Sequence, residues 1–131
     1  MNPSSEDVKD MLEAVSSLGL TFGVDLFIGL EPAQPNDCVT IFDTPGGPPQ
    51  LTLTQGEDYF YPAIQIRVRN DDYAVGWDLI DDIKTALHGK GQETWNGTYY
   101  SVIKCTQEPF LLDWDNRGRA RFVVTFDLQR R

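Results

Sequence analysis

Residues 61–89 constrain the fold of this chain more than any other stretch. Apolar and polar side chains alternate over residues 61–69, which is the pattern of a strand with one buried face. Polar residues then lead into a helical pattern that ends at Gly89. The final segment, residues 117–131, alternates in the same way as the first strand. A strand that leads into a helix, in a chain that ends on further strands, predicts an α+β fold.

The remaining segments predict a first helix and further short strands. Apolar residues from Val8 to Leu18 follow a helical spacing, so an amphipathic helix is expected to end at Gly19. Ser4 or Ser5 is expected to cap its N-terminus. Further strand-like runs occupy residues 24–28, 38–42, 51–54 and 99–106.

The length of the chain, 131 residues, predicts a single domain over residues 1–131. The expected architecture is a mostly antiparallel β-sheet with two α-helices packed on one face. Asn96 and Gly97 predict a tight turn between strands, whereas residues 110–115 are interpreted as an apolar connector. Residues 43–58 are rich in proline and glycine and predict a protruding loop.

The second helix is expected to bury an aromatic stripe. Tyr73, Trp77 and Ile80 lie on one face of it at helical spacing. Trp77 is therefore predicted to pack on the central strand, against residues 64–68. The alternative is that Trp77 anchors a neighbouring subunit, because aromatic residues are enriched at interface hot spots.

The charges are divided unevenly along the chain. The net charge is −9, and residues 1–60 alone carry ten acidic side chains and one basic one, whereas residues 61–131 carry ten of each. The overall acidity argues against nucleic-acid binding, including sequence-specific binding, because phosphates would be repelled. One interpretation is that the acidic N-terminal half meets the arginine-rich C-terminal end of another subunit in a head-to-tail ring. The alternative is that these charges are solvated.

Arginines on the strands and residues of the predicted loop are the candidate contacts with other proteins. If the strands at residues 61–69 and 117–131 pair, the arginines on their polar faces form a basic band. The acidic counterparts are expected in the loop at residues 43–58, which has the composition of an arm that becomes ordered on a partner. The alternative is that the arginines keep a sheet edge soluble. The candidate interface residues are Arg67, Arg69, Arg117, Arg119, Arg121, Asp43, Glu57 and Asp58, and the candidate partner loop consists of Pro45, Gly46, Gly47, Pro48 and Pro49.

The residue pattern gives no indication of catalysis or metal binding. His88 is the single histidine, and it is expected in the last turn of the second helix, where a charged imidazole would favour the helix dipole. Residues 113–118 are similar to the start of a calcium loop, but Val124 stands where that motif requires glutamate. Cys38 and Cys105 are expected to be buried free thiols, and the alternative is a disulfide between them. We therefore expect no catalytic residue, no metal and no cofactor.

The sequence also suggests where the protein is found. It has no apolar run long enough to span a membrane. Its first residues are polar and acidic and do not have the pattern of a secretory signal. The protein is expected to remain in the cytoplasm in which it is made.

The order and spacing of these segments resemble the tail-terminator, or tail-completion, proteins of long-tailed bacteriophages, a family also labelled bacteriophage minor capsid protein. The strand at residues 61–69 carries the closest resemblance, which extends over nearly the whole chain. The other matching segments are Leu18-Gly19-Leu20, Leu26 to Gly29, the Pro-x-x-Pro-Asn-Asp segment from Pro32, Val39 to Gly47, Asp72-Tyr73, Asn96-Gly97, Tyr99-Tyr100, Pro109, Asp115 with Arg119, and the alternating C-terminal end.

The resemblance implies a structural virion protein without enzymatic activity. It implies a homo-oligomer, expected as a hexameric ring, that caps the tail tube and joins it to the neck or connector protein of the head. Such a protein would lie at the tail–neck junction of the virion after assembly in the host cytoplasm. The alternatives are another neck component, such as a head-completion or adaptor protein, and a small cytosolic ligand-binding domain with a pocket near Trp77, Trp95 and Trp114.

Overall fold

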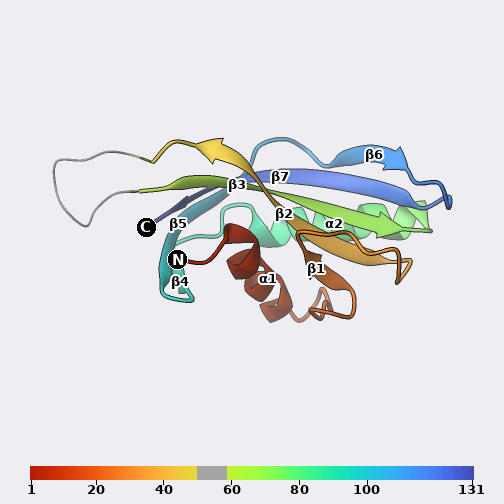
Figure 1. Ribbon diagram of the computed structural model, residues 1–131, viewed down its shortest axis with the longest axis horizontal. Helices are drawn as coiled ribbons and strands as arrows, with labels where there is room; N and C mark the ends of the chain where they lie inside the picture. Colours follow the sequence, from red (N-terminus) through yellow and green to blue (C-terminus); the bar gives the residue numbers. More distant parts are fainter. Residues whose placement is uncertain (50–58) are drawn as a thin grey trace.

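The computed structural model describes residues 1–49 and 59–131, and in that part of the chain two helices accompany seven strands (Figure 1). This composition confirms the predicted α+β fold. Of the helices in these residues, none is both long and apolar enough to cross a membrane. The elements are α1 (Ser4–Ala14), β1 (Leu26–Ile28), β2 (Cys38–Gly47), β3 (Tyr61–Asn70), α2 (Tyr73–Leu87), β4 (Glu93–Trp95), β5 (Thr98–Cys105), β6 (Phe110–Trp114) and β7 (Ala120–Arg130).

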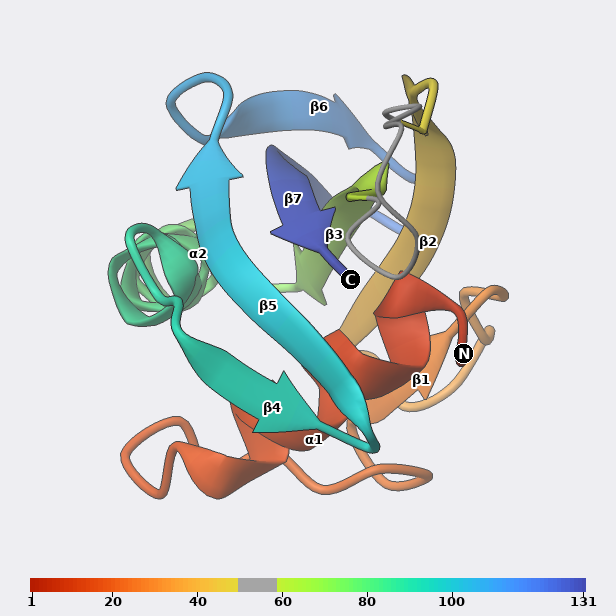
Figure 2. The ribbon, with the colours of Figure 1, turned by 90° about the vertical axis from the view of Figure 1, so that its left-hand side faces the viewer.

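The seven strands form one sheet in which β7 is the central element. The order is β1-β2-β3-β7-β5-β4, and β6 also pairs with β7. Every pairing between these strands is antiparallel except that of β1 with β2. β6 pairs with the first half of β7 and β5 pairs with the second half, so both lie along the same edge of it. Figure 2 shows the sheet curling from β1 to β4, with α1 between these two edge strands.

Both helices pack on the same face of the sheet, as predicted. The inward faces of β3 and β7 are apolar and buried, and the buried stripes of α1 and α2 join them in one core. Burial of such side chains is the main favourable contribution to folding. This core includes Val8, Met11 and Leu12 from α1, Ile80, Ile83 and Leu87 from α2, Ile64, Ile66 and Val68 from β3, and Phe122, Val124 and Phe126 from β7.

A buried polar cluster ties α1 to the sheet. Asp7, in the first turn of α1, is fully buried. Its carboxylate accepts hydrogen bonds from the Tyr100 hydroxyl and from Asn96 Nδ2, the second at 2.8 Å. Arg130 Nη1 lies 3.9 Å from the same carboxylate. Burial, together with the hydrogen bond to Asp7, raises the pKa of the Tyr100 phenol, so its proton is held in this cluster.

The prediction that Trp77 packs in the core is wrong. The Trp77 side chain is 38% exposed and that of Tyr73 is 49% exposed, because the buried stripe of α2 is centred on Gly76 and Ile80 instead. Gly76 brings the helix close to the sheet: a Cβ atom there would lie 2.9 Å from Cε2 of Phe122. The Phe122 ring from β7 therefore fills the space that the sequence pattern assigned to Trp77.

Gly76→Ala is expected to destabilise the protein although alanine favours helices. Overpacking a core typically costs about 1–3 kcal/mol, whereas alanine gains about 1 kcal/mol over glycine inside a helix. The added methyl would also lie 3.1 Å from Cβ of Asn70. We expect chemical denaturation to show a loss of about 1 kcal/mol, with Val75→Ala on the exposed side of α2 as a near-neutral control. A gain in stability would mean that α2 does not depend on this close approach.

Two further segments differ from the prediction for identifiable reasons. Residues 110–114 form the strand β6, so their interpretation as a connector is wrong. The sequence did not indicate this strand because a bulge between Leu111 and Asp113 breaks the period of two that identifies a strand. β2 continues to Gly47, so the first part of the predicted loop at residues 43–58 is a strand paired with β3. Residues 50–58, which include the expected strand at 51–54, lie outside the described part.

The helix and hairpin ends also allow a comparison. α1 ends at Ala14 instead of extending to Leu18, and Gly19 follows in a loop with φ of +65°. The turn predicted at Asn96 and Gly97 is confirmed, since both residues have positive φ and join β4 to β5.

Candidate assembly interface

Arg69 is an internal anchor and not part of an exposed basic band. Its side chain is 3% exposed. Its guanidinium donates to the carbonyl oxygens of Pro35 at 2.6 Å and Asn36 at 3.2 Å, and to Glu31 Oε1 at 3.1 Å. The residue therefore holds the segment from residue 31 to residue 36 against the end of β3.

Arg119, in the turn before β7, fixes the same segment. It is 6% exposed, and its Nη1 atom donates to the carbonyl oxygen of Ala33 at 2.8 Å. Its Nε atom donates to Asp115 Oδ2 at 2.7 Å, and its backbone N–H donates to Oδ1 of the same carboxylate. Desolvation opposes ionisation of Asp115, but these hydrogen bonds and one from the Arg117 backbone lower its pKa to about 2.

Arg121 completes this internal network. Its guanidinium forms a two-pronged contact with the Asp113 carboxylate on β6, in which Nε lies 2.6 Å from Oδ1. Its Nη1 also lies 3.5 Å from Glu31. The hydrogen bonds from Arg121 lower the pKa of Asp113. The predicted basic band required exposed arginines. That prediction is wrong for Arg69 and Arg119, which are buried, and Arg121 is already paired with Asp113 and Glu31.

Arg67 and Arg117 are the predicted arginines that remain available to another molecule. Arg67 lies over the Phe42 ring, 4.8 Å from its centroid, and donates to Gln65 at 2.9 Å. Arg117 is exposed on the turn between β6 and β7. Contact of these two residues with a partner remains a prediction.

Asp43 serves a purpose inside the subunit that the sequence did not indicate. Its carboxylate accepts from the Ser5 backbone N–H at 3.0 Å and from the Ser5 hydroxyl at 2.6 Å. Ser4 and Ser5 already belong to α1, so the prediction that one of them caps the helix is wrong. The cap is supplied from β2, since a carboxylate is favourable at the positive end of a helix. Glu57 and Asp58 lie outside the described residues.

The predicted partner loop borders a trough at one end of the sheet. Pro45 and Gly46 occupy a bulge of β2 opposite β3, where proline and glycine are tolerated. Pro48 and Pro49 follow and are exposed. The trough has a volume of about 380 Å³ and is lined by Pro45, Gly46, Gly47, Tyr61, Val102, Lys104, Asp127, Leu128 and Gln129.

An exposed aromatic cluster at the other end of the sheet was not identified from the sequence as a group. Tyr73 stacks on Trp114 with 6.1 Å between ring centroids, and Tyr73 and Trp77 both contact the buried Phe122 ring edge-on. Trp114 is 52% exposed. The helical spacing of Tyr73 and Trp77 was visible, but the pairing of β6 with β7 is needed to bring Trp114 beside them. Trp95 lies elsewhere, under the Lys90 ammonium, so the three tryptophans do not share one pocket.

His88 and Cys105 contact each other through a hydrogen bond to the backbone. His88 Nδ1 accepts a hydrogen bond from the Cys105 backbone N–H at 3.0 Å. Both cysteines are free thiols, as predicted, but only Cys38 is buried, whereas Cys105 is partly exposed. Within residues 1–49 and 59–131, no group of histidine, cysteine or acidic side chains is arranged to hold a metal ion.

Comparison with known proteins identifies the family. The fold resembles a chain from the virion of a native gene transfer agent particle, with a TM-score of 0.65 and 13% sequence identity over 96% of this chain and 92% of that chain. No curated protein matches the sequence. The family model described as bacteriophage tail terminator protein matches residues 14–130. The chain therefore belongs to the bacteriophage tail terminator protein family.

Proposed function

We propose that this protein is a structural component of a phage-like virion that forms a ring on the end of the tail tube and joins the tube to the neck or connector of the head. The observation that carries the proposal is the family match over residues 14–130. The fold shared with a chain of a gene transfer agent virion adds support. Within this proposal the protein is not an enzyme, acts as one domain and assembles as a hexamer in the host cytoplasm.

The internal arginine network supports a role for the subunit in assembly. Three of the arginines expected at an interface are used to hold the loop at residues 31–36 and the β6–β7 turn. A rigid subunit loses less conformational entropy when it joins a ring. Arg67, Arg117 and the loop at residues 45–49 remain candidate contacts with the tube or the connector.

Tail-tube growth tests the proposal directly. Purified tube protein from a phage that encodes this chain is polymerised with and without the chain, and tube lengths are measured by negative-stain electron microscopy. We expect that adding the chain during growth stops elongation, and that the tubes then resist extension when fresh tube protein is supplied. An unchanged length distribution at saturating chain would contradict the proposed function.

A further inference from the structure

The aromatic cluster of Tyr73, Trp77 and Trp114 forms, together with Asp78 and Asp81 of α2, a surface that we call the acidic corner. Each of the three rings is between one third and about half exposed although they contact one another and Phe122. Residues 71–88 carry five acidic side chains. One of them, Asp81, forms an ion pair with Lys84 at 3.0 Å. Exposed aromatic clusters with a polar rim are typical of protein contacts.

A surface of opposite character lies at the far end of the same sheet. We call it the basic end and define it by Phe60, Val102, Lys104 and Arg131, which are all exposed. The Arg131 guanidinium lies 5.1 Å from the centroid of the Tyr99 ring and 5.4 Å from that of Tyr59. Lys104 also lines the trough of about 380 Å³. Lys104 and Arg131 are the exposed basic side chains here, whereas Arg130 is held in the cluster around Asp7, and the exposed acid Asp127 lies opposite Lys104 on β7.

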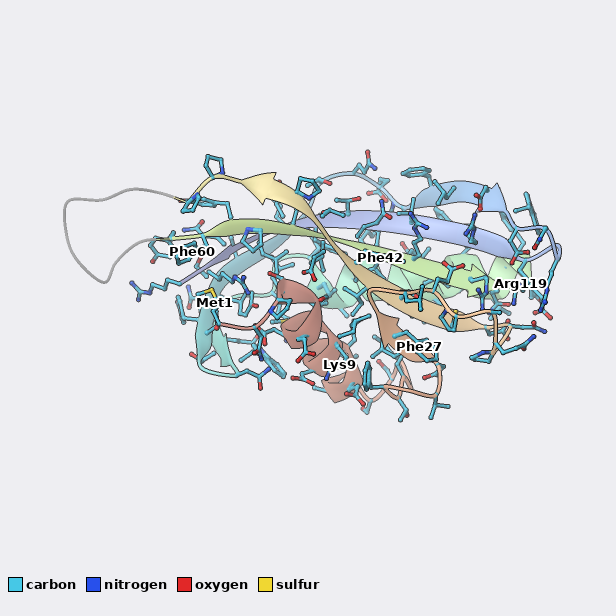
Figure 3. All side chains as sticks on the ribbon, viewed as in Figure 1. Met1, Lys9, Phe27, Phe42, Phe60 and Arg119 are labelled. Atoms are coloured by element: carbon cyan, nitrogen blue, oxygen red, sulfur yellow. The ribbon has the colours of Figure 1, made fainter. Side chains whose placement is uncertain are left out.

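The two surfaces cannot meet within one subunit. Trp114 pairs with Ala120 at the start of β7, whereas Phe60 pairs with Arg130 at its end. A strand rises about 3.3 Å per residue, so the length of β7 separates them. Figure 3 shows Phe60 and Arg119 at opposite ends of the molecule.

We propose that the acidic corner of one subunit docks on the basic end of a second copy of this chain. The charges of the two surfaces are complementary, and the trough offers space for a projecting aromatic side chain. Two different surfaces at opposite ends give a head-to-tail contact, which closes into a ring when the rotation between neighbours permits it. This inference rests on the proposed ring and names the surfaces that build it.

Paired charge reversals test this contact. One variant reverses the acidic corner (Asp78→Lys with Asp81→Lys), a second reverses the basic end (Lys104→Glu with Arg131→Glu), and a third combines all four changes. Assembly of the full chain, alone and with tail tubes, is followed by native mass spectrometry at low ionic strength. We expect each double variant to need at least about tenfold more protein for half-assembly, and the combined variant to recover most of this loss.

Aromatic truncation provides an independent test. Trp114→Ala should weaken assembly by at least about tenfold with little change in the unfolding midpoint of the monomer. Leu30→Ala is the matched control, since Leu30 is an exposed apolar residue outside both surfaces. Rings that form normally in the Trp114 variant and in both double variants would overturn this inference and leave the proposed function intact. A wild-type chain that forms no ring, even with tail tubes, would overturn the proposed function and this inference together.

Discussion

Arg119→Glu is expected to lower the free energy of unfolding by about 3–5 kcal/mol, the usual cost of breaking a buried ion pair. The substitution removes the partner of Asp115 and the donor to the Ala33 carbonyl, and it places two carboxylates together at a site that is 6% exposed. The loop at residues 31–36 should then detach from the sheet. Urea denaturation of the monomer measures the loss, and hydrogen exchange locates it.

Arg117→Glu is the matched control for this prediction. Arg117 is exposed and lies two residues away on the same turn. Its substitution by glutamate changes the net charge by the same amount as Arg119→Glu. Its effect on stability should stay within about 0.5 kcal/mol. Equal effects of the two substitutions would show that net charge, and not the buried network, determines the result.

The same network determines the direction in which the stability of the protein changes with pH. The Asp115 pKa is lowered from 3.8 to about 2 in the folded protein. A lowered pKa means that the folded state favours the carboxylate, so its contribution is present above pH 4 and is lost as the pH falls towards 2. We expect wild-type stability to decline over this range and Asp115→Asn to remove part of that decline. A wild-type curve with the slope of the variant would contradict this account.

Phe122→Ala is expected to cost about 3–5 kcal/mol, as truncation of a buried aromatic residue usually does. Phe122 is fully buried and supports Tyr73 and Trp77, both of which lie against its ring. Trp77→Ala should cost much less, about 1 kcal/mol, because that indole is partly exposed. Thermal or chemical unfolding of the two variants compares their losses of stability. A larger loss for Trp77→Ala than for Phe122→Ala would mean that α2 buries its Trp77 face and not its Gly76 face.

The sequence predicted the elements whose periodicity is undisturbed. β3 alternates from Ile64 to Arg69 and β7 from Val124 to Gln129, and α2 has a clear N-cap in Asp72, whose side chain accepts from the backbone of Ala74 and Val75. β6 was missed because a bulge interrupts its alternation. The helical period alone could not distinguish Trp77 from Gly76 as the centre of the buried stripe, since a glycine contributes no side chain to the pattern.

The candidate interface was less predictable because it depends on long-range pairing. The alternating pattern assigned Arg69 and Arg119 to polar strand faces, which suggests exposure, but a loop more than 30 residues away covers them. Asp43 has the appearance of a loop acid and caps α1 instead. Such partners are brought together by topology, and no local pattern of residues contains that information.

Electron cryomicroscopy of tails completed with this protein shows most directly whether it forms a terminal ring. We expect a closed ring of six copies at one end of the tube, the end that joins the head. Within that ring, the acidic corner around Trp114 should face the Lys104 and Arg131 end of the next subunit. Density for the protein along the sides of the tube, or its absence from both ends of finished tails, would contradict the account.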